Sequence, residues 1–280
     1  MRLHFYRGSL LLIILFILPG FSVGKTKPKW RKLEQGLYIG VFEASQKSPV
    51  GDSRVTVIKI DPGYYDFEIY CASEYGKKLR TTREWAVEFG LTAAINAGMY
   101  AIDHLTSVGY LKSGDHLNNP RISKKYNSIF ACGALSDKVP SAQIIDLRCQ
   151  DFASLKKRYH SFTQGIRMIS CRQKNVWQQQ LRKWSIAALG MDKEGNILFI
   201  HCRSPYSVHD FNNIILKLPL KIHTAMYLEG GPEASLYYRA HGEKKELMGS
   251  YETGFLPSNG NTVAWQVPNV IGVRRKKKAP

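Results

Sequence analysis

The sequence predicts an α+β fold, a single mixed domain in which a strand-rich sheet core carries a few short helices. Three observations support this. The chain has 280 residues, of which 44% are hydrophobic and 11% aromatic, so it is too apolar to be disordered. Short stretches rich in β-branched and aromatic residues recur between turn residues. The body shows no internal repeat and no linker, and its length fits one domain.

The strand predictions rest on these apolar stretches and on the turns between them. Asp61-Pro62-Gly63 is a turn signal, which predicts that 54–61 and 64–71 form a hairpin. Asp192 to Asn196 predicts a second hairpin, between 186–189 and 197–202. The full set of predicted strands is 37–44, 54–61, 64–71, 92–95, 128–135, 143–147, 186–189, 197–202, 224–228 and 262–267.

Three short helices are predicted from their start signals. Thr81 and Glu84 have the spacing of a capping box, and Gly90 ends the helix that they begin. Ser207 caps a helix through about Leu218 that carries an apolar face. Residues 151–159 form the third predicted helix, which is short and basic.

The two ends of the chain differ from its body. Residues 1–24 have a cationic start, an apolar run from Leu10 to Leu18 and small residues near a cleavage position, the layout of a signal peptide. The apolar run is too short to span a bilayer as a helix. The predicted divisions are therefore 1–24, signal peptide; 25–32, basic segment; 33–273, folded domain; and 274–280, basic tail. The mature protein is expected to be secreted or periplasmic, and an uncleaved anchor is the alternative.

Much of the positive charge lies in these ends. The formal net charge is +18, but residues 33–273 carry only +6. We therefore expect no nucleic-acid partner. The basic tails are expected to rest on an anionic envelope surface or simply to aid solubility.

Several chemistries lack the motifs they need. The five cysteines have no CxxC spacing, so zinc and redox sites are not indicated; one or two disulfides are possible, with no pairing favoured. GxSxG, HExxH, P-loop and GxGxxG motifs are absent. We therefore expect no metal and no cofactor.

Two segments share a design that suits a site, an apolar strand that ends in glycines and polar groups. Residues 93–100 place Asn96 before Gly98 and Tyr100. Residues 225–235 place Glu229 before Gly230 and Gly231. A strand fixes the backbone, and glycines let a ligand approach it. Glu229 is therefore expected to face a cavity, although a tight turn with a solvated glutamate would show the same pattern.

Further candidates are polar residues beside apolar stretches. Arg203 follows a strand and precedes a helix start, which favours an anion site. Gln164 and Arg167 bracket Gly165-Ile166, just before the apolar Met168-Ile169. Structural ion pairs are the alternative for both arginines. His209 is a weak candidate on the helix, and Glu252, in the loop 249–255, is a possible second carboxylate.

At these residues the sequence resembles the phosphodiester glycosidase family. The family's Asn-Gly-Gly-Phe-Phe type stretch corresponds to Asn96-Ala97-Gly98-Met99-Tyr100. Its later Ala-hydrophobic-Gly-hydrophobic-Asp stretch corresponds to Ala188-Leu189-Gly190-Met191-Asp192. Its Leu-Asp-Gly-Gly stretch corresponds to Leu228-Glu229-Gly230-Gly231, with Ser235 downstream. The similarity runs from about Val55 to Leu236. Glu229 in place of Asp, and Pro232-Glu233 after the glycines, depart from the pattern and suggest a secreted bacterial branch.

The resemblance implies a hydrolase that cleaves the bond between an anomeric carbon and a phosphate oxygen. Glu229, Asn96 and Glu252 would be the catalytic residues. Substrate would be bound by Gly98, Tyr100, Gln164, Arg167, Arg203, His209, Gly230, Gly231 and Ser235. The substrate would be a glycan or sugar phosphate. Two other functions are weighed against catalysis, a non-catalytic envelope carbohydrate-binding protein of the same fold and a basic structural protein tethered by its tails.

Overall fold

The computed structural model describes Met1 and residues 30–277, which fold into sheets with short helices. The strands are β1 (Arg31–Glu34), β2 (Leu37–Glu43), β3 (Arg54–Ile60), β4 (Tyr65–Cys71), β5 (Ala93–Asn96), β6 (Leu111–Ser113), β7 (His116–Asn119), β8 (Ser128–Ala134), β9 (Ala142–Asp146), β10 (Tyr159–Ile169), β11 (Trp184–Asp192), β12 (Ile197–Tyr206), β13 (Ile222–Gly230), β14 (Ser235–Ala240), β15 (Glu243–Met248) and β16 (Asn269–Arg275). The α-helices are α1 (Thr82–Glu88), α2 (Phe152–Leu155) and α3 (Val208–Lys217); the 3-10 turns are η1 (Lys156–Arg158) and η2 (Gly231–Glu233).

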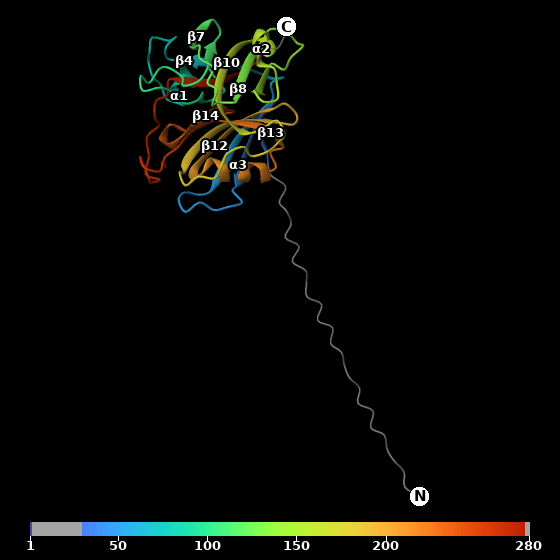
Figure 1. The fold of residues 1–280 in the computed structure, drawn as a ribbon. Coiled ribbons are helices and arrows are strands. Elements are labelled where there is room, and N and C mark those ends of the chain that lie inside the picture. The colour runs from blue at the N-terminus through green and yellow to red at the C-terminus, as the bar shows by residue number, and fades with distance from the viewer. Residues whose placement is uncertain (2–29, 278–280) are drawn as a thin grey trace.

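The strands form two antiparallel sheets (Figure 1). The larger, 11-stranded sheet follows the order β1-β2-β3-β12-β11-β13-β10-β6-β7, with β8 paired to β10 and β9 to β8. The 5-stranded sheet follows the order β15-β14-β5-β16-β4. β13 therefore lies inside the larger sheet, between β11 and β10.

The main core lies between the two sheets. Phe199 and Leu228 of the larger sheet and Ile95 and Ile271 of the smaller one belong to the same buried cluster. The outer face of the larger sheet packs on α3, and the outer face of the smaller sheet packs on α1. The two helices accordingly lie on opposite sides of the molecule (Figure 1).

The prediction of a strand-rich single domain with short helices is confirmed, although the helices are so few and short that the fold is mostly β. The predicted helix caps and the second predicted hairpin are present. Thr81 accepts from the Glu84 N–H and Glu84 accepts from the Thr81 N–H, which completes the capping box. Ser207 caps α3 by accepting from the Asp210 N–H, and β11 and β12 pair as the second predicted hairpin.

Two predictions about strands are wrong, one about a pairing and one about the position of the last strand. The turn after Asp61 exists, but β3 pairs with β2 and β12, while β4 pairs with β16 in the other sheet. Both edges of β3 are occupied, so the turn carries the chain from one sheet to the other. Residues 262–267 were predicted to form the last strand, but the last strand is β16. In 262–267, Val267 forms an isolated bridge with Arg80, and Val263 is exposed.

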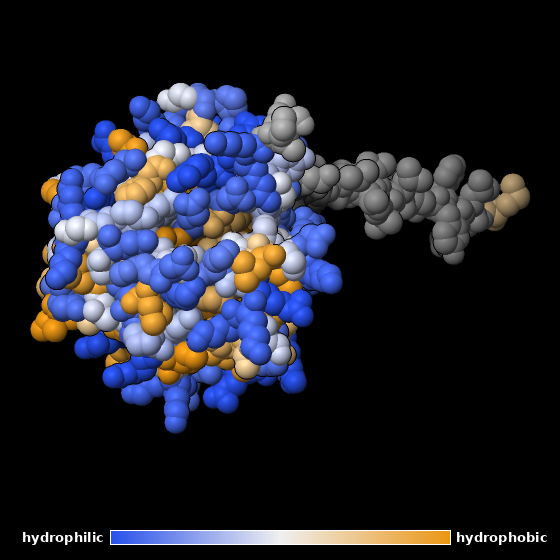
Figure 2. All heavy atoms as spheres, turned by 90° about the horizontal axis from the view of Figure 1, so that it is seen from above, coloured by the Kyte–Doolittle hydropathy of each residue, from blue (hydrophilic) through white to orange (hydrophobic). Residues whose placement is uncertain are grey.

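Parts of both predicted basic segments lie in strands. Arg31 and Lys32 lie in β1, and Arg274 and Arg275 lie in β16, because these strands extend the sheets into both segments. Arg31 pairs with Glu243, and Arg274 donates to the Tyr70 hydroxyl. The predicted signal peptide lies outside the described residues apart from Met1. Within the described part, no helix has the length and apolarity to cross a membrane. Hydrophilic side chains dominate the face seen in Figure 2, with scattered hydrophobic ones.

Candidate functional site

Glu229 lies at a β-bulge near the end of β13. Ala187 of β11 is opposite Glu229 and Ala188 is opposite Tyr227, so Leu228 is the extra residue. Bulges redirect a side chain while the rest of the strand stays paired. The bulge fixes Glu229 on a rigid base, and its Oε1 accepts from the Gly230 N–H at 3.0 Å.

Two further carboxylates converge on the turn that follows β13. Gly231 has a φ of +65°, a conformation that favours glycine. A Cβ at this position would lie 2.7 Å from Glu252 Oε2 and 3.5 Å from Glu233 Oε2. Glu229, Glu233 and Glu252 are called the acidic cluster below. Its members come from one strand, one 3-10 turn and one distant loop.

The loop that carries Glu252 is fastened to the start of β11. The Ser185 N–H donates to the Tyr251 carbonyl at 2.9 Å, and the Thr253 N–H donates to the Lys183 carbonyl at 3.1 Å. A bridge joins Trp184 to Glu252. Since β11 is the neighbour of β13, these bonds place Glu252 beside the end of β13.

Three tyrosines border the acidic cluster. The Tyr100 hydroxyl donates to Glu233 Oε1 at 3.5 Å. Burial raises the pKa of Tyr100, Tyr126 and Tyr227, and the Glu229 carboxylate raises each further. A Cβ on Gly230 would collide with the Tyr227 hydroxyl, so the absence of a side chain there leaves room for the phenol. All three phenols therefore remain hydrogen-bond donors at physiological pH.

The acidic cluster shifts its own protonation. Burial raises the pKa of Glu229 to about 8, helped by the charges of Glu233 and Glu252 and opposed by the Gly230 N–H. Burial also raises the pKa of Glu233, with a further contribution from Glu252. Like charges in one site cannot all ionise cheaply. Glu229 is therefore mostly a neutral acid at pH 7.

Asn96 lies inside the fold. It is 1% exposed, and its Oδ1 accepts from the Ser235 N–H at 3.2 Å, while its Nδ2 has no partner among the described residues. Ser235 is equally buried. The structure thus gives Asn96 the role of joining β5 to the start of β14. Gly98, at a φ of +128°, is buried near the carbonyls of Gln164 and Leu228.

Gln164 organises a loop. Its Oε1 accepts from the N–H groups of Tyr110 and Ser123, at 3.0 and 2.9 Å. Its Nε2 donates to the carbonyls of Ser123 and Tyr126, at 2.9 and 2.7 Å. It is 2% exposed, so it positions Tyr126 rather than reaching a substrate itself.

The two predicted anion-binding arginines differ. Arg203 donates to Asn259 Oδ1 and to the carbonyls of Met248, Asn259 and Asn261. These bonds occupy its guanidinium, so it fastens the 259–261 segment instead of offering a free fork to phosphate. Arg167 uses one nitrogen, Nη1, for the two oxygens of Asp146, and lines a cavity of about 490 Å³.

His209 lies on the first turn of α3 and makes no hydrogen bond to the acidic cluster among the described residues. Its Nδ1 is 3.5 Å from Asp210 Oδ1, and its carbonyl accepts from Asn175 Nδ2. Asp210 in turn accepts from Gln179. The first turn of α3, which carries His209, therefore holds both ends of the segment 175–179.

Among the described residues, one group of three metal-ligand types lies close enough to share an ion, namely Asp146, Cys149 and Cys171. Its two cysteines form a disulfide, so their sulfurs are not available as thiolate ligands. The remaining cysteines, Cys71, Cys132 and Cys202, are free and buried.

Sequence reasoning missed Glu233, Tyr126 and Tyr227. Glu233 was seen only as an interruption of a glycine–serine run, yet its place two residues after Gly231 puts it on the same turn as Glu229. Tyr126 and Tyr227 carry no local signal, because Tyr227 is placed by the pairing of β13 with β10 and Tyr126 by its bond to Gln164 of β10.

Comparisons with known proteins agree with this architecture. The sequence profile of the phosphodiester glycosidase family matches residues 89–274. No protein of curated function matches the chain in sequence.

Solved structures that share the fold include the following three. The catalytic domain of zebrafish N-acetylglucosamine-1-phosphodiester alpha-N-acetylglucosaminidase, auto-inhibited by its pro-peptide, aligns with a TM-score of 0.59 and 11% identity, covering 89% of this chain and 88% of that chain. A hypothetical protein from Synechocystis has a TM-score of 0.57 and 14% identity, covering 89% and 64%. A putative exported protein from Burkholderia pseudomallei has a TM-score of 0.50 and 10% identity, covering 79% and 73%.

Proposed function

Because the chain belongs to the phosphodiester glycosidase family, we propose that it hydrolyses the bond between a sugar's anomeric carbon and a phosphate oxygen. The proposed substrates are sugar-1-phosphodiesters in envelope or extracellular glycans. The similarity in fold to an enzyme named for N-acetylglucosamine-1-phosphodiesters supports this choice of substrate class. The acidic cluster is the observation that carries the proposal.

Hydrolysis of a glycosidic bond commonly uses two carboxyl groups held in different protonation states. The raised pKa of Glu229, about 8, suits the proton donor. Glu252 then supplies the carboxylate that faces the anomeric carbon or activates water. Burial raises the pKa of Glu233, although the hydrogen bond from Tyr100 opposes this, and the charge of Glu233 adds to the raised pKa of Glu229.

A neutral Glu229 also reduces the repulsion between the acidic cluster and an anionic substrate. The substrate phosphodiester is an anion, and three ionised carboxylates would repel it. The protonated acid instead donates a hydrogen bond to a phosphate oxygen. The leaving phosphate is a weak base, so it needs little more protonation than this to depart.

The purified protein should release free sugar from α-linked N-acetylglucosamine-1-phosphodiesters or related sugar-1-phosphodiesters. Glu229→Gln removes the proton donor while keeping the side-chain volume, and should lower kcat by about a hundredfold or more. Glu74→Gln, at an exposed glutamate on another part of the surface, is the matched control. Equal turnover by the wild type and Glu229→Gln would refute the assignment.

A non-catalytic carbohydrate-binding protein of the same fold is the second candidate. The burial of Asn96 and the occupied guanidinium of Arg203 favour it, since one expected catalytic residue lies inside the fold and one expected substrate contact bonds to the protein itself. Binding of the same phosphodiesters by the folded wild type, without release of sugar, would identify this function.

We further propose that residues 1–24 are a cleaved signal peptide and that the mature protein acts in the periplasm or outside the cell. The Cys149–Cys171 disulfide supports an oxidising compartment. N-terminal sequencing of the exported protein should give a start at Lys25. Residues beyond the strands, at both basic ends, are proposed to contact the anionic envelope.

A further inference from the structure

We propose that the cavity lined by Arg167 is the subsite for the leaving phosphate and for the hydroxyl-bearing group attached to it, a phosphorylated sugar or polyol. This inference rests on the proposed function. The cavity has a volume of about 490 Å³ and is formed by three segments, 125–127, 166–167 and 176–180. It is called the aglycone cavity below.

The aglycone cavity is positively charged. Lys125 and Arg167 line it, and Arg148 lies beside it, since its Nε donates to Asn127 Oδ1 at 3.1 Å. The carboxylate paired with Arg167 belongs to Asp146. It already accepts from Arg167 and from the N–H groups of Arg148 and Cys171. Lys125 is exposed, and its ammonium makes no bond or ion pair with the described residues. This arrangement suits an anion.

The aglycone cavity adjoins the acidic cluster through two tyrosines. Tyr126 stands between two lining residues, Lys125 and Asn127, and Glu229 contributes to raising its pKa. Tyr227 is opposite Ile166 across the strand pair, and its ring centroid is 5.9 Å from that of Trp177. Both Ile166 and Trp177 line the cavity. A substrate with its sugar at the acidic cluster would therefore extend its phosphate toward the cations.

The rest of the lining indicates a hydroxylated group rather than an acyl chain. Three glutamines, Gln178, Gln179 and Gln180, line it, together with the indole of Trp177. The buried Nε2 of Gln180 and Nε of Arg167 have no hydrogen-bond partner among the described residues, so the donor capacity of these two side chains is not used up within the fold. Amide groups around one aromatic face bind sugars and polyols well, whereas a lipid tail would need an apolar lining.

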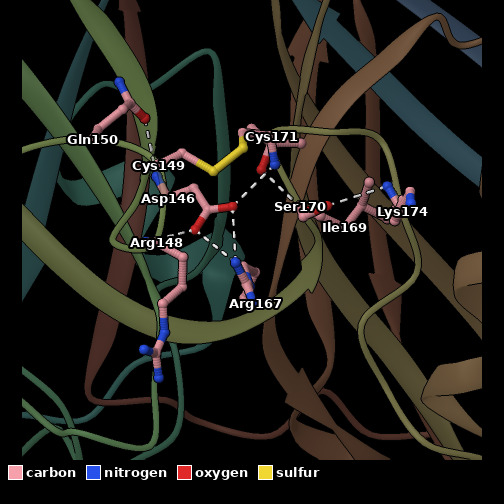
Figure 3. Close-up of a disulfide and its surroundings, with 10 residues drawn as sticks. Asp146, Arg148, Cys149, Gln150, Arg167, Ile169, Ser170, Cys171 and Lys174 are labelled. Carbon is pink, nitrogen blue, oxygen red and sulfur yellow. Dashed lines mark hydrogen bonds and ion pairs between the residues drawn. A yellow bond between two sulfur atoms is a disulfide. The ribbon is translucent and has the colours of Figure 1, made fainter.

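Arg167 is held ready for this role (Figure 3). Its Nη1 lies 2.9 and 3.1 Å from the two oxygens of the buried Asp146. The Cys171 N–H donates to Asp146 Oδ2 at 2.9 Å, and the Cys149–Cys171 disulfide ties together the chain segments on both sides. The Arg167 carbonyl accepts from Trp177 Nε1 at 2.7 Å, which fixes the indole to the same strand. Such fixed groups bind with little ordering cost.

Binding of the product-like fragment tests the subsite without turnover. The full mature chain would be titrated by calorimetry with inorganic phosphate, glycerol 3-phosphate, glucose 6-phosphate and glucose. We expect glycerol 3-phosphate and glucose 6-phosphate to bind more tightly than inorganic phosphate, and glucose alone to bind least. Lys125→Ala should weaken the binding of glucose 6-phosphate by about fivefold to tenfold, since one charge-assisted contact is lost.

Lys124→Ala is the matched control, because Lys124 is an exposed neighbour that does not line the cavity. Equal weakening by both variants would show a diffuse surface charge and overturn the proposal. So would binding of inorganic phosphate as tight as that of both phosphomonoesters, or no binding at all. Binding that depends on Lys125 in a protein with no turnover would keep the subsite and refute the hydrolase, so the two failures are distinguishable.

Discussion

The side chain of Gln164 and the backbone of Tyr126 are joined across two segments that are far apart in the sequence. Gln164 Nε2 donates to the Tyr126 carbonyl at 2.7 Å. Gln164 lies in β10, and two later residues of the same strand, Ile166 and Arg167, line the aglycone cavity. The same amide holds both backbone polar groups of Ser123. One buried side chain therefore sets the position of the loop that carries both Lys125 and a tyrosine of the site.

Gln164→Met should loosen this loop. The variant loses four hydrogen bonds and leaves buried backbone groups unpaired, which should lower the free energy of unfolding by about 2–4 kcal/mol. Urea unfolding measures the loss, and chymotrypsin cleavage after Tyr126 should become faster. Gln35→Met, at an exposed glutamine, should change neither. A Gln164→Met protein as stable as the wild type would show that water or another group replaces the amide.

The activity should fall above pH 8. The proton donor Glu229 loses its proton as the pH rises through its pKa of about 8, so kcat/KM should drop about tenfold per pH unit beyond it. A pH–rate profile measured on a sugar-1-phosphodiester checks this. An unchanged rate up to pH 10 would exclude Glu229 as the acid.

The stability should depend on pH in the same window. The folded-state pKa of Glu229 lies above the unfolded value of about 4.5, so the stability it contributes is complete below pH 4.5 and is lost as the pH rises to about 8. Glu229→Gln carries no such proton. Since Glu229 keeps some solvent contact, we expect the variant to gain about 1–3 kcal/mol over the wild type at pH 9 relative to pH 5. Urea unfolding at both pH values measures the difference, and equal changes in both proteins would contradict it.

Gly231→Ala should damage the acidic cluster. The added Cβ would lie 2.7 Å from Glu252 Oε2, which must move, and kcat/KM should fall about tenfold or more. Gly254→Ala is a closely matched control, because Gly254 also has a positive φ, +87°, but open space around its Cβ. Both variants should lose about 1 kcal/mol of stability from backbone strain. Equal activity losses in both would show that backbone strain, and not the contact with Glu252, matters.

The disulfide should contribute about 3 kcal/mol, since it closes a loop between residues separated by 22 positions. The double variant Cys149→Ser/Cys171→Ser should be less stable by this amount and bind glucose 6-phosphate more weakly. Reductant should destabilise the wild type in urea and leave the double variant unchanged. An equal effect of reductant on both proteins would show that the loss of stability does not come from breaking this disulfide.

The sequence predicted what short-range chemistry decides. The capping box at Thr81, the cap at Ser207 and the turn after Asp192 each depend on residues within a few positions, and all three formed. The turn after Asp61 also formed, but its hairpin did not, because the partners of β3 and β4 come from distant parts of the chain. Pairing depends on which edges the whole fold leaves open, and no local pattern contains that.

The same limit applies to the site. The position of Glu229 near the end of a strand was predictable because the strand and the glycines are adjacent to it, and Glu252 was a candidate because of its glycine-bounded loop. The grouping of Glu252 with Glu233 depends on the bonds between 183–185 and 251–253, which are long-range. Arg203 had a good local context for an anion site, but the fold uses its guanidinium to hold the 259–261 segment.

The order of the sheets has a consequence for how the chain folds. β3 pairs with β12, and β4 and β5 both pair with β16, which is among the last segments to be synthesised. During synthesis, early strands therefore keep an unpaired edge until more than a hundred further residues have been made. Such long-range pairing slows folding and exposes strand edges to misassociation. A truncation before Asn269 would remove the strand that joins β4 to β5 and leave β4 without its partner, so the smaller sheet can be completed only after the end of the domain has been synthesised.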